Sequence, residues 1–214
     1  MDDTRLPRFF IAGITEPKPR SSATEEASLI MRLLNSGAVD LIHLRKPEAS
    51  AEYTLSLIEN IDQDLHSRLV LHSHFHLINN FRPGGVHDKQ PDSSVCLGLA
   101  NQMEIPLSCS CHSLEDFCKT EIHKYSYCFL SPIFDSISKT GYLSRFSLDD
   151  PRLHTLASTH RIVALGGVTP DHFAKLYAAK FAGAALLGYL WSPKSGIDEK
   201  IKKIITARKN IIKP

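Results

Sequence analysis

The amino-acid sequence predicts an α/β protein built as a single (β/α)8 TIM barrel over residues 1–214. Short β-type runs alternate with helical stretches from one end of the chain to the other, which in a compact domain indicates a parallel sheet with crossover helices. The chain length also fits one small barrel domain. An open, doubly wound sheet would use the same elements, but no GxGxxG motif follows the first strand, so closure into a barrel is favoured.

Eight runs have the length and the apolar, β-branched composition of strands. They span residues 9–14, 39–45, 68–72, 85–88, 106–110, 126–131, 161–166 and 183–187. Together with the alternation, this is the number of strands that a TIM barrel needs.

Helical stretches are predicted between these strands from apolar spacing and from capping residues at their starts. They span residues 23–36, 50–65, 113–122, 147–157, 170–179 and 197–210. Ser50 can cap the second, and Ser113, Ser147 and Thr169 precede the next three. The intervals after the third and fourth strands are too short for long helices, so none is predicted there.

Composition and charge exclude several classes of protein. The net charge of +2 comes from 25 basic and 23 acidic residues spread along the chain, and no basic run joins exposed aromatics, so nucleic acid is not an expected partner. No apolar stretch reaches the ~18 residues of a spanning helix, and the N-terminus is too charged for a secretory signal. We therefore expect a cytoplasmic protein with no membrane partner.

The cysteines favour free thiols over a disulfide framework, because they are odd in number and lack CxxC spacing. They are Cys96, Cys109, Cys111, Cys118 and Cys128. Cys109 and Cys111 lie on one predicted strand, where small apolar packing is favoured over a metal site.

Glycines follow the last two predicted strands. VALGGVTPDHF at 163–173 runs from a strand into Gly166 and Gly167, and AGAALLGYLW at 182–191 ends its strand at Gly188. Glycines let a phosphate approach backbone N–H groups, and phosphate sites between the last two strands recur in TIM barrels. The two turns together predict a phosphate site, although either alone could be a plain strand-to-helix turn.

The second and fifth strands carry polar side chains toward the same end of the barrel. His43 and Arg45 in HLRKP alternate and so point the same way, into the barrel mouth, where Arg45 could bind an oxyanion. Ser110 and His112 in SCSCHS share one side of the fifth strand, and an imidazole beside a hydroxyl suits acid–base chemistry. A surface Arg45, a core His43 and a capping His112 are the structural alternatives.

A long loop, SPIFDSISKTGY at 131–142, follows the sixth strand. Its hydroxyl residues Ser136 and Ser138 and the adjacent Lys139 could bind an anion, and an unspecialised surface loop is the alternative.

Histidines around the third and fourth strands raise a metal-site alternative. LHSHFH at 71–76 supplies His72, His74 and His76, and His87 lies on the next strand beside Asp88. If strand geometry continued, His72 and His74 would share a side and could bind zinc, as in a metal-dependent hydrolase. Against this, the segment is expected to turn into a helix at His74.

In this order, the motifs resemble those of the thiamine phosphate synthase and thiazole tautomerase (TenI-like) family over about residues 9–210. HLRKP is similar to the family's Q/H-x-R segment, GVHDKQ to its GVHLGQ, and SCHS to its S-x-H-S. SPIFDSISK is similar to GPxFxTxTK, VALGGVTPDHF to ALGGI-TP, and GAALLGYLW to the last strand and phosphate loop.

The resemblance implies a role for each matching residue. It assigns polar substrate contacts to Ser110, Ser136, Ser138 and Lys139, phosphate-binding turns to Gly166, Gly167 and Gly188, and the proton transfer of the tautomerase branch to His112. His43 and Arg45 fall in the segment that lines the substrate site.

Two departures weaken the pyrophosphate site of the synthase branch. The synthase has an Asn-Asp pair after the third strand, and this chain has His72-Ser73, which leaves Asp92 as the candidate for the second metal carboxylate. The synthase also has a lysine two residues after the arginine, where this chain has Pro47, with Lys46 one place early. Mg²⁺ needs carboxylates, and the pyrophosphate leaving group needs charge neutralisation.

The resemblance therefore favours a tautomerase that needs no cofactor, in which His112 shuttles a proton, Arg45 steers a carboxylate and the glycine turns hold the phosphate of thiazole phosphate. A thiamine phosphate synthase is the first alternative, with Arg45 and Lys139 neutralising pyrophosphate and Mg²⁺ held by Asp92, with Asp88 as a further ligand. A non-catalytic binder of thiamine phosphate is the second. The sequence leaves the oligomeric state open, a homo-oligomer included.

Overall fold

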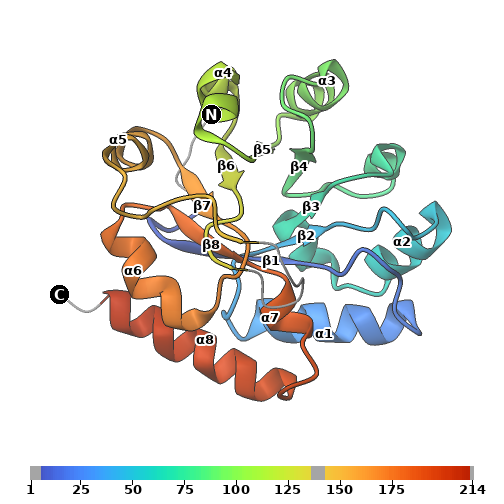
Figure 1. The fold of residues 1–214 in the computed structure, drawn as a ribbon. Coiled ribbons are helices and arrows are strands. Elements are labelled where there is room, and N and C mark those ends of the chain that lie inside the picture. Colours follow the sequence, from blue (N-terminus) through green and yellow to red (C-terminus); the bar gives the residue numbers. More distant parts are fainter. Residues whose placement is uncertain (1–5, 136–142, 213–214) are drawn as a thin grey trace.

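The computed structural model describes residues 6–135 and 143–212, and eight parallel strands in it close into a barrel (Figure 1). The strands are β1 Phe10–Ile14, β2 Leu41–Leu44, β3 Leu69–Leu71, β4 Gly85–Asp88, β5 Leu107–Cys111, β6 Tyr127–Leu130, β7 Ile162–Ala164 and β8 Gly183–Leu186. Each pairs with the next in chain order, and β8 pairs with β1. The predicted (β/α)8 barrel is confirmed, and every predicted strand is present within two residues at each boundary.

Helices surround the barrel on its outside (Figure 1). They are α1 Ala23–Asn35, α2 Ala51–Glu59, α3 Ser94–Met103, α4 Leu114–Lys119, α5 Pro151–Thr159, α6 Phe173–Ala178, α7 Gly188–Trp191 and α8 Ile197–Ile212. The side chains of Ser50 and Ser113 cap α2 and α4 as predicted, by accepting from the backbone N–H groups of the third residue on. Asp150, rather than Ser147, caps α5. No described helix is both long and apolar enough to cross a membrane.

The connection after β4 contains a helix that the sequence did not predict. It is α3, which ends at Glu104 in the left-handed backbone conformation. Its buried residues, Cys96 and Ala100, are small, and the larger Leu97, Leu99 and Met103 are only partly buried against the core, so the apolar pattern that marks a core-facing helix is weak. The connection after β3 has only a short 3₁₀ helix, Phe75–Asn79, so the expectation of no long helix holds there.

Strand side chains alternate between two cores, as a closed barrel requires. One core lies between the strands and the helices. The other fills the barrel interior and contains Phe10, Ala12, Ile14, Leu41, Val70, Tyr127, Phe129, Val163 and Ala185. Along β2, β4 and β5 part of this interior is polar, because His43, His87 and Ser108 are all buried there. The polar layer lies directly beneath the loops in which TIM barrels carry their sites.

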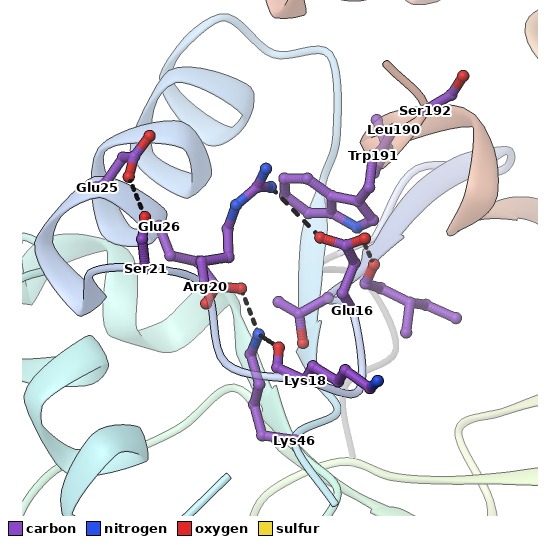
Figure 2. Close-up of polar contacts among 12 residues, drawn as sticks. Glu16, Lys18, Arg20, Ser21, Glu25, Glu26, Lys46, Leu190, Trp191 and Ser192 are labelled. Atoms are coloured by element: carbon purple, nitrogen blue, oxygen red, sulfur yellow. Dashed lines mark hydrogen bonds and ion pairs between the residues drawn. The ribbon is translucent and has the colours of Figure 1, made fainter. Parts of the chain in front are cut away.

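A buried ion pair anchors the loop between β1 and α1 (Figure 2). The Nζ of Lys46 lies 2.6 Å from Oε1 of Glu26, and these side chains are 0% and 1% exposed. Lys46 also donates to the backbone carbonyl of Lys18 in the loop, and the Tyr53 hydroxyl donates to the second oxygen of Glu26. Lys46 thus fixes the path of the chain beside the barrel mouth.

Candidate active site

A pocket of about 310 Å³ opens at the carboxyl ends of the strands. It is lined by Ile14, Arg45, Pro47, His72, Ser73, His87, Lys89, Ser110, His112, Phe129, Ser131, Leu165, Gly166, Gly167, Val168, Ala185, Leu187, Gly188 and Tyr189. Hollows of about 510 and 550 Å³ lie at the opposite end of the barrel, around Arg161. Because TIM barrels build their active sites at the carboxyl ends of the strands, the smaller pocket is the candidate site.

Most of the predicted site residues in the described part of the chain meet in this pocket. The six that line it are Arg45, Ser110, His112, Gly166, Gly167 and Gly188. His43 lies below them, fully buried in the barrel interior, and does not line the pocket. Ser136, Ser138 and Lys139 lie outside the described residues.

His112 stands at the pocket wall just past the end of β5. Its Nδ1 lies 3.1 Å from the hydroxyl of Ser131 and 3.4 Å from the carbonyl oxygen of the same residue. Because a carbonyl oxygen only accepts, this arrangement favours the proton on Nδ1 and leaves Nε2 as the basic nitrogen. His112 is therefore held in a form that can accept a proton.

The turn after β7 brings backbone N–H groups to the pocket. Gly166 and Gly167 have φ angles of 89° and 65°, and a Cβ on Gly167 would lie 2.2 Å from the carbonyl oxygen of Asp135. Only glycine fits this turn, because the φ angles are left-handed and the neighbouring backbone is close. Among the described residues, the N–H groups of Gly166, Gly167 and Val168 find no acceptor. An anion in the pocket could supply one.

Three histidines from consecutive strands form the floor of the pocket. We call His43, His72 and His87 the histidine cluster. Nδ1 of His43 lies 2.8 Å from Nε2 of His72, and the rings of His72 and His87 stack with centroids 4.1 Å apart. Ser110 connects the cluster to the pocket wall, because its hydroxyl lies 2.9 Å from Nε2 of His87.

The histidine cluster is uncharged at neutral pH. Burial lowers the pKa of His43 and His72 well below the usual range, and each is lowered further by the neighbouring His87. Burial, with a smaller effect from the Arg45 guanidinium, lowers the pKa of His87 to about 3. Desolvation penalises the charged imidazolium, so neutral imidazoles face the pocket.

The charged side chains that line the pocket are cationic. They are Arg45 and Lys89, and no carboxylate of the described residues is among the lining. Lys46, one residue from Arg45, points instead into the helix layer, where it pairs with Glu26. The pocket is therefore suited to an anionic ligand.

The carboxylates that a Mg²⁺ site would require do not come together at the pocket. Asp88 is buried, and its oxygens accept from the backbone N–H groups of Gln90 and Ser93 and from the Tyr125 hydroxyl. Asp92 has its own N–H bonded to Tyr125, and neither aspartate lines the pocket. Since Mg²⁺ prefers carboxylate oxygens, the described residues do not fit this ion.

The turn into a helix expected at His74 is confirmed, because a 3₁₀ helix begins at Phe75, and the alternative in which His72 and His74 share a side does not hold. His74 has a left-handed backbone, with φ of 54°, and its Nε2 lies 3.1 Å from the carbonyl oxygen of Ala49. The chain leaves the strand direction after His72, so the two rings do not share a side. His76 is exposed.

Several residues that line the pocket were not predicted to do so, chiefly Lys89, Ser131 and Tyr189. Lys89 could have been found, because it directly follows the fourth strand. The cluster of His43, His72 and His87 could not be predicted from the sequence, because it forms only where three strands lie side by side in the fold.

The cysteines are free thiols, as predicted, and Cys109, Cys111 and Cys128 pack in the layer outside the strands. Sγ of Cys128 lies 3.4 Å from Sγ of Cys111. Cys109 and Cys111 therefore take part in buried packing.

Comparison with known proteins points to one family. The family model described as thiamine monophosphate synthase matches residues 10–190. The chain is similar to the structure of thiamine phosphate pyrophosphorylase from Bacteroides thetaiotaomicron, with 27% identity, a TM-score of 0.72, and coverage of 94% of this chain and 98% of that chain. No curated protein matches the chain in sequence.

Two more distant structures share the fold. Thiamine phosphate pyrophosphorylase from Pyrococcus furiosus is 15% identical, with a TM-score of 0.72 and coverage of 99% of both chains. N-(5'-phosphoribosyl)anthranilate isomerase from Pyrococcus furiosus is 13% identical, with a TM-score of 0.62 and coverage of 94% of this chain and 99% of that chain.

Proposed function

The chain belongs to the thiamine monophosphate synthase family, whose enzymes act in thiamine biosynthesis, and from this we propose that it is a thiazole tautomerase of the TenI-like branch. The reaction moves a proton on a thiazole carboxylate phosphate and yields its aromatic isomer. It transfers no group and requires no cofactor. It needs an acid–base residue, an anchor for the phosphate and a partner for the carboxylate.

One observation carries the proposal: the imidazole of His112 and a turn whose backbone N–H groups find no acceptor among the described residues line the same pocket, which is cationic and has no carboxylate among its described lining residues. A substrate with two anionic groups suits such a pocket. The absence of Mg²⁺ ligands there argues against pyrophosphate chemistry, because that chemistry needs the ion to neutralise the leaving group.

Each group has a distinct task in the proposed reaction. The N–H groups of Gly167 and Val168 hold the phosphate, with the Gly188 turn opposite, and the Arg45 guanidinium pairs with the carboxylate. Nε2 of His112 takes the proton from one ring carbon and returns it to another, so the substrate is isomerised with no net loss or gain of atoms. Ser131 keeps His112 oriented through Nδ1. Lys139 is assigned a substrate contact by resemblance alone.

The proposal is tested by His112→Asn, which keeps a polar side chain but removes the base. Turnover of the thiazole carboxylate phosphate should fall by about 10²–10⁴-fold, the usual contribution of a general base, while ligand affinity stays within a few-fold. The matched control is His123→Asn, since His123 is exposed at the opposite end of the barrel. Near wild-type turnover by His112→Asn would refute the assignment.

A thiamine phosphate synthase is the second candidate, favoured by the 27% identity to a thiamine phosphate pyrophosphorylase over nearly the whole of both chains. Incubation with hydroxymethylpyrimidine pyrophosphate, thiazole phosphate and Mg²⁺ tests it directly. Formation of thiamine phosphate at a rate comparable to a control synthase would establish this candidate over the tautomerase. Tight binding of thiamine phosphate with no turnover in either assay would instead identify a non-catalytic binder.

A further inference from the structure

We propose that the histidine cluster, His43, His72 and His87, is a binding site for one divalent transition-metal ion of the zinc class. The site lies at the floor of the pocket and goes beyond the proposed tautomerase, whose chemistry uses no metal. Its test does not depend on that function, because the readout is metal binding.

The three rings bring ligand nitrogens close together. One nitrogen from each ring lies within 4.8 Å of the other two, and the closest pair, on His43 and His72, is 2.8 Å apart. Three imidazole nitrogens at Zn–N distances of about 2.0–2.1 Å in a tetrahedral site are separated by roughly 3.3 Å. The His43–His72 spacing is shorter than that value, so an ion would replace the proton shared by these two rings and move them apart. The stacked rings of His72 and His87 would have to turn for both nitrogens to face the ion.

Hydrogen bonds on the far side of two rings hold them as ligands. Nδ1 of His87 lies 2.9 Å from the hydroxyl of Ser108, and that hydroxyl donates to the carbonyl oxygen of Val86. Nδ1 therefore carries the proton, and Nε2, which accepts from the Ser110 hydroxyl 2.9 Å away, has the lone pair that a metal would take over from that hydrogen bond. Nε2 of His43 lies 2.8 Å from the Tyr127 hydroxyl, which leaves Nδ1 to face His72. Partners of this kind orient the histidines of metal sites.

The charge state suits a metal, although one cation lies nearby. Imidazole binds metal only when neutral, and burial keeps all three rings neutral at neutral pH. The Arg45 guanidinium also lies close enough to lower the pKa of His72 and His87, so it would repel a bare cation. An anionic fourth ligand, hydroxide or a carboxylate, would pair with the metal and Arg45 together.

The site is reachable and selective. His72 and His87 line the pocket, so an ion can enter from it and a fourth position remains open toward it, as in zinc sites with three protein ligands. The ligands are all imidazole nitrogens, which suit Zn²⁺, Co²⁺ or Ni²⁺, whereas Mg²⁺ and Ca²⁺ require oxygen ligands.

Metal titration of the full chain tests the proposal. The protein is purified without a polyhistidine tag, stripped with a chelator and titrated with Co²⁺, followed by visible absorption. We expect one Co²⁺ per chain with the intense band of a tetrahedral site, displacement by Zn²⁺ and no competition from Mg²⁺. His72→Gln and His87→Gln should each weaken binding by at least about 100-fold, and Ser108→Ala by about 10–100-fold.

The matched control is His74→Gln, because His74 bonds to Ala49 and not to the cluster, and it should bind Co²⁺ like the wild type. Proton NMR of the Co²⁺-loaded wild type gives a second measurement that needs no variant, since three imidazole rings should show hyperfine-shifted signals. Less than one tetrahedral Co²⁺ per chain, or equal binding by His72→Gln and His74→Gln, would overturn the proposal.

Discussion

Removal of Lys46 from its buried ion pair should destabilise the protein severely. In Lys46→Met, the Glu26 carboxylate, 1% exposed, loses the ammonium 2.6 Å away and the Lys18 carbonyl loses its donor. Removing one partner of a buried pair costs about 3–5 kcal/mol, because the other charge is left uncompensated. The Tyr53 hydroxyl still donates to Glu26 at 2.8 Å, so the lower end, about 3 kcal/mol, is expected.

Urea denaturation followed by circular dichroism measures this loss. Glu26→Gln combined with Lys46→Met should recover about 2 kcal/mol relative to the sum of the single variants, because the stranded charge is gone. The matched control is Lys203→Met, which removes an exposed pair with Glu199 and should cost less than about 0.5 kcal/mol. If Lys46→Met costs no more than this control, the pair is not desolvated and the reasoning is wrong.

Three further changes probe the same regions. Burial and Glu26 raise the pKa of Tyr53 to about 12, so the folded state holds this proton after the unfolded state has lost it. Stability should therefore fall as pH rises from about 10 to 12, and Tyr53→Phe should flatten that part of the urea-midpoint profile. Gly167→Ala places a Cβ 2.2 Å from a backbone oxygen, so it should lower the free energy of unfolding by about 1–3 kcal/mol and weaken phosphate binding. The control is Gly98→Ala, in open space within α3, which should raise the free energy of unfolding by about 0.5–1 kcal/mol in thermal melts. Arg45→Gln should weaken binding of the thiazole carboxylate phosphate by about 10–100-fold in calorimetry, because a charge-assisted bond is lost. Unchanged affinity would show that Arg45 does not contact the carboxylate.

The strands could be predicted because their signal is local. Runs such as the one around Phe10 and Ile11 are apolar on both faces, as barrel strands must be, and that pattern needs no knowledge of neighbours. Helix α3 was not predicted because its fully buried residues, Cys96 and Ala100, are small and its larger apolar residues are only partly buried. The cap of α5 was displaced to Asp150 because Pro151 prefers the first helical position.

The site was predictable where one strand determines it. Arg45, His112 and the glycine turns reach the pocket because side chains near strand ends in a barrel face its mouth. In the histidine cluster, His72 and His87 follow His43 by 29 and 44 positions in the sequence. The hydrogen bonds of the cluster depend on how the barrel strands are aligned with one another. The turn at His74 was predictable because the third strand is short, and the 3₁₀ helix that follows it begins at Phe75.

The placement of Lys46 bears on the chemistry that we propose for this pocket. Because successive side chains point to opposite faces at the end of β2, Arg45 faces the pocket and Lys46 faces the helix layer. There Lys46 pairs with Glu26 and is fully buried. A lysine at position 47 would return to the pocket side, but that position is Pro47, which lines the pocket without charge. The ammonium group that would neutralise pyrophosphate therefore stabilises the fold instead. Arg45 and Lys89 remain as the cations among the described lining residues, above the imidazoles of the pocket floor, and this charge balance supports the proposed proton transfer over pyrophosphate displacement.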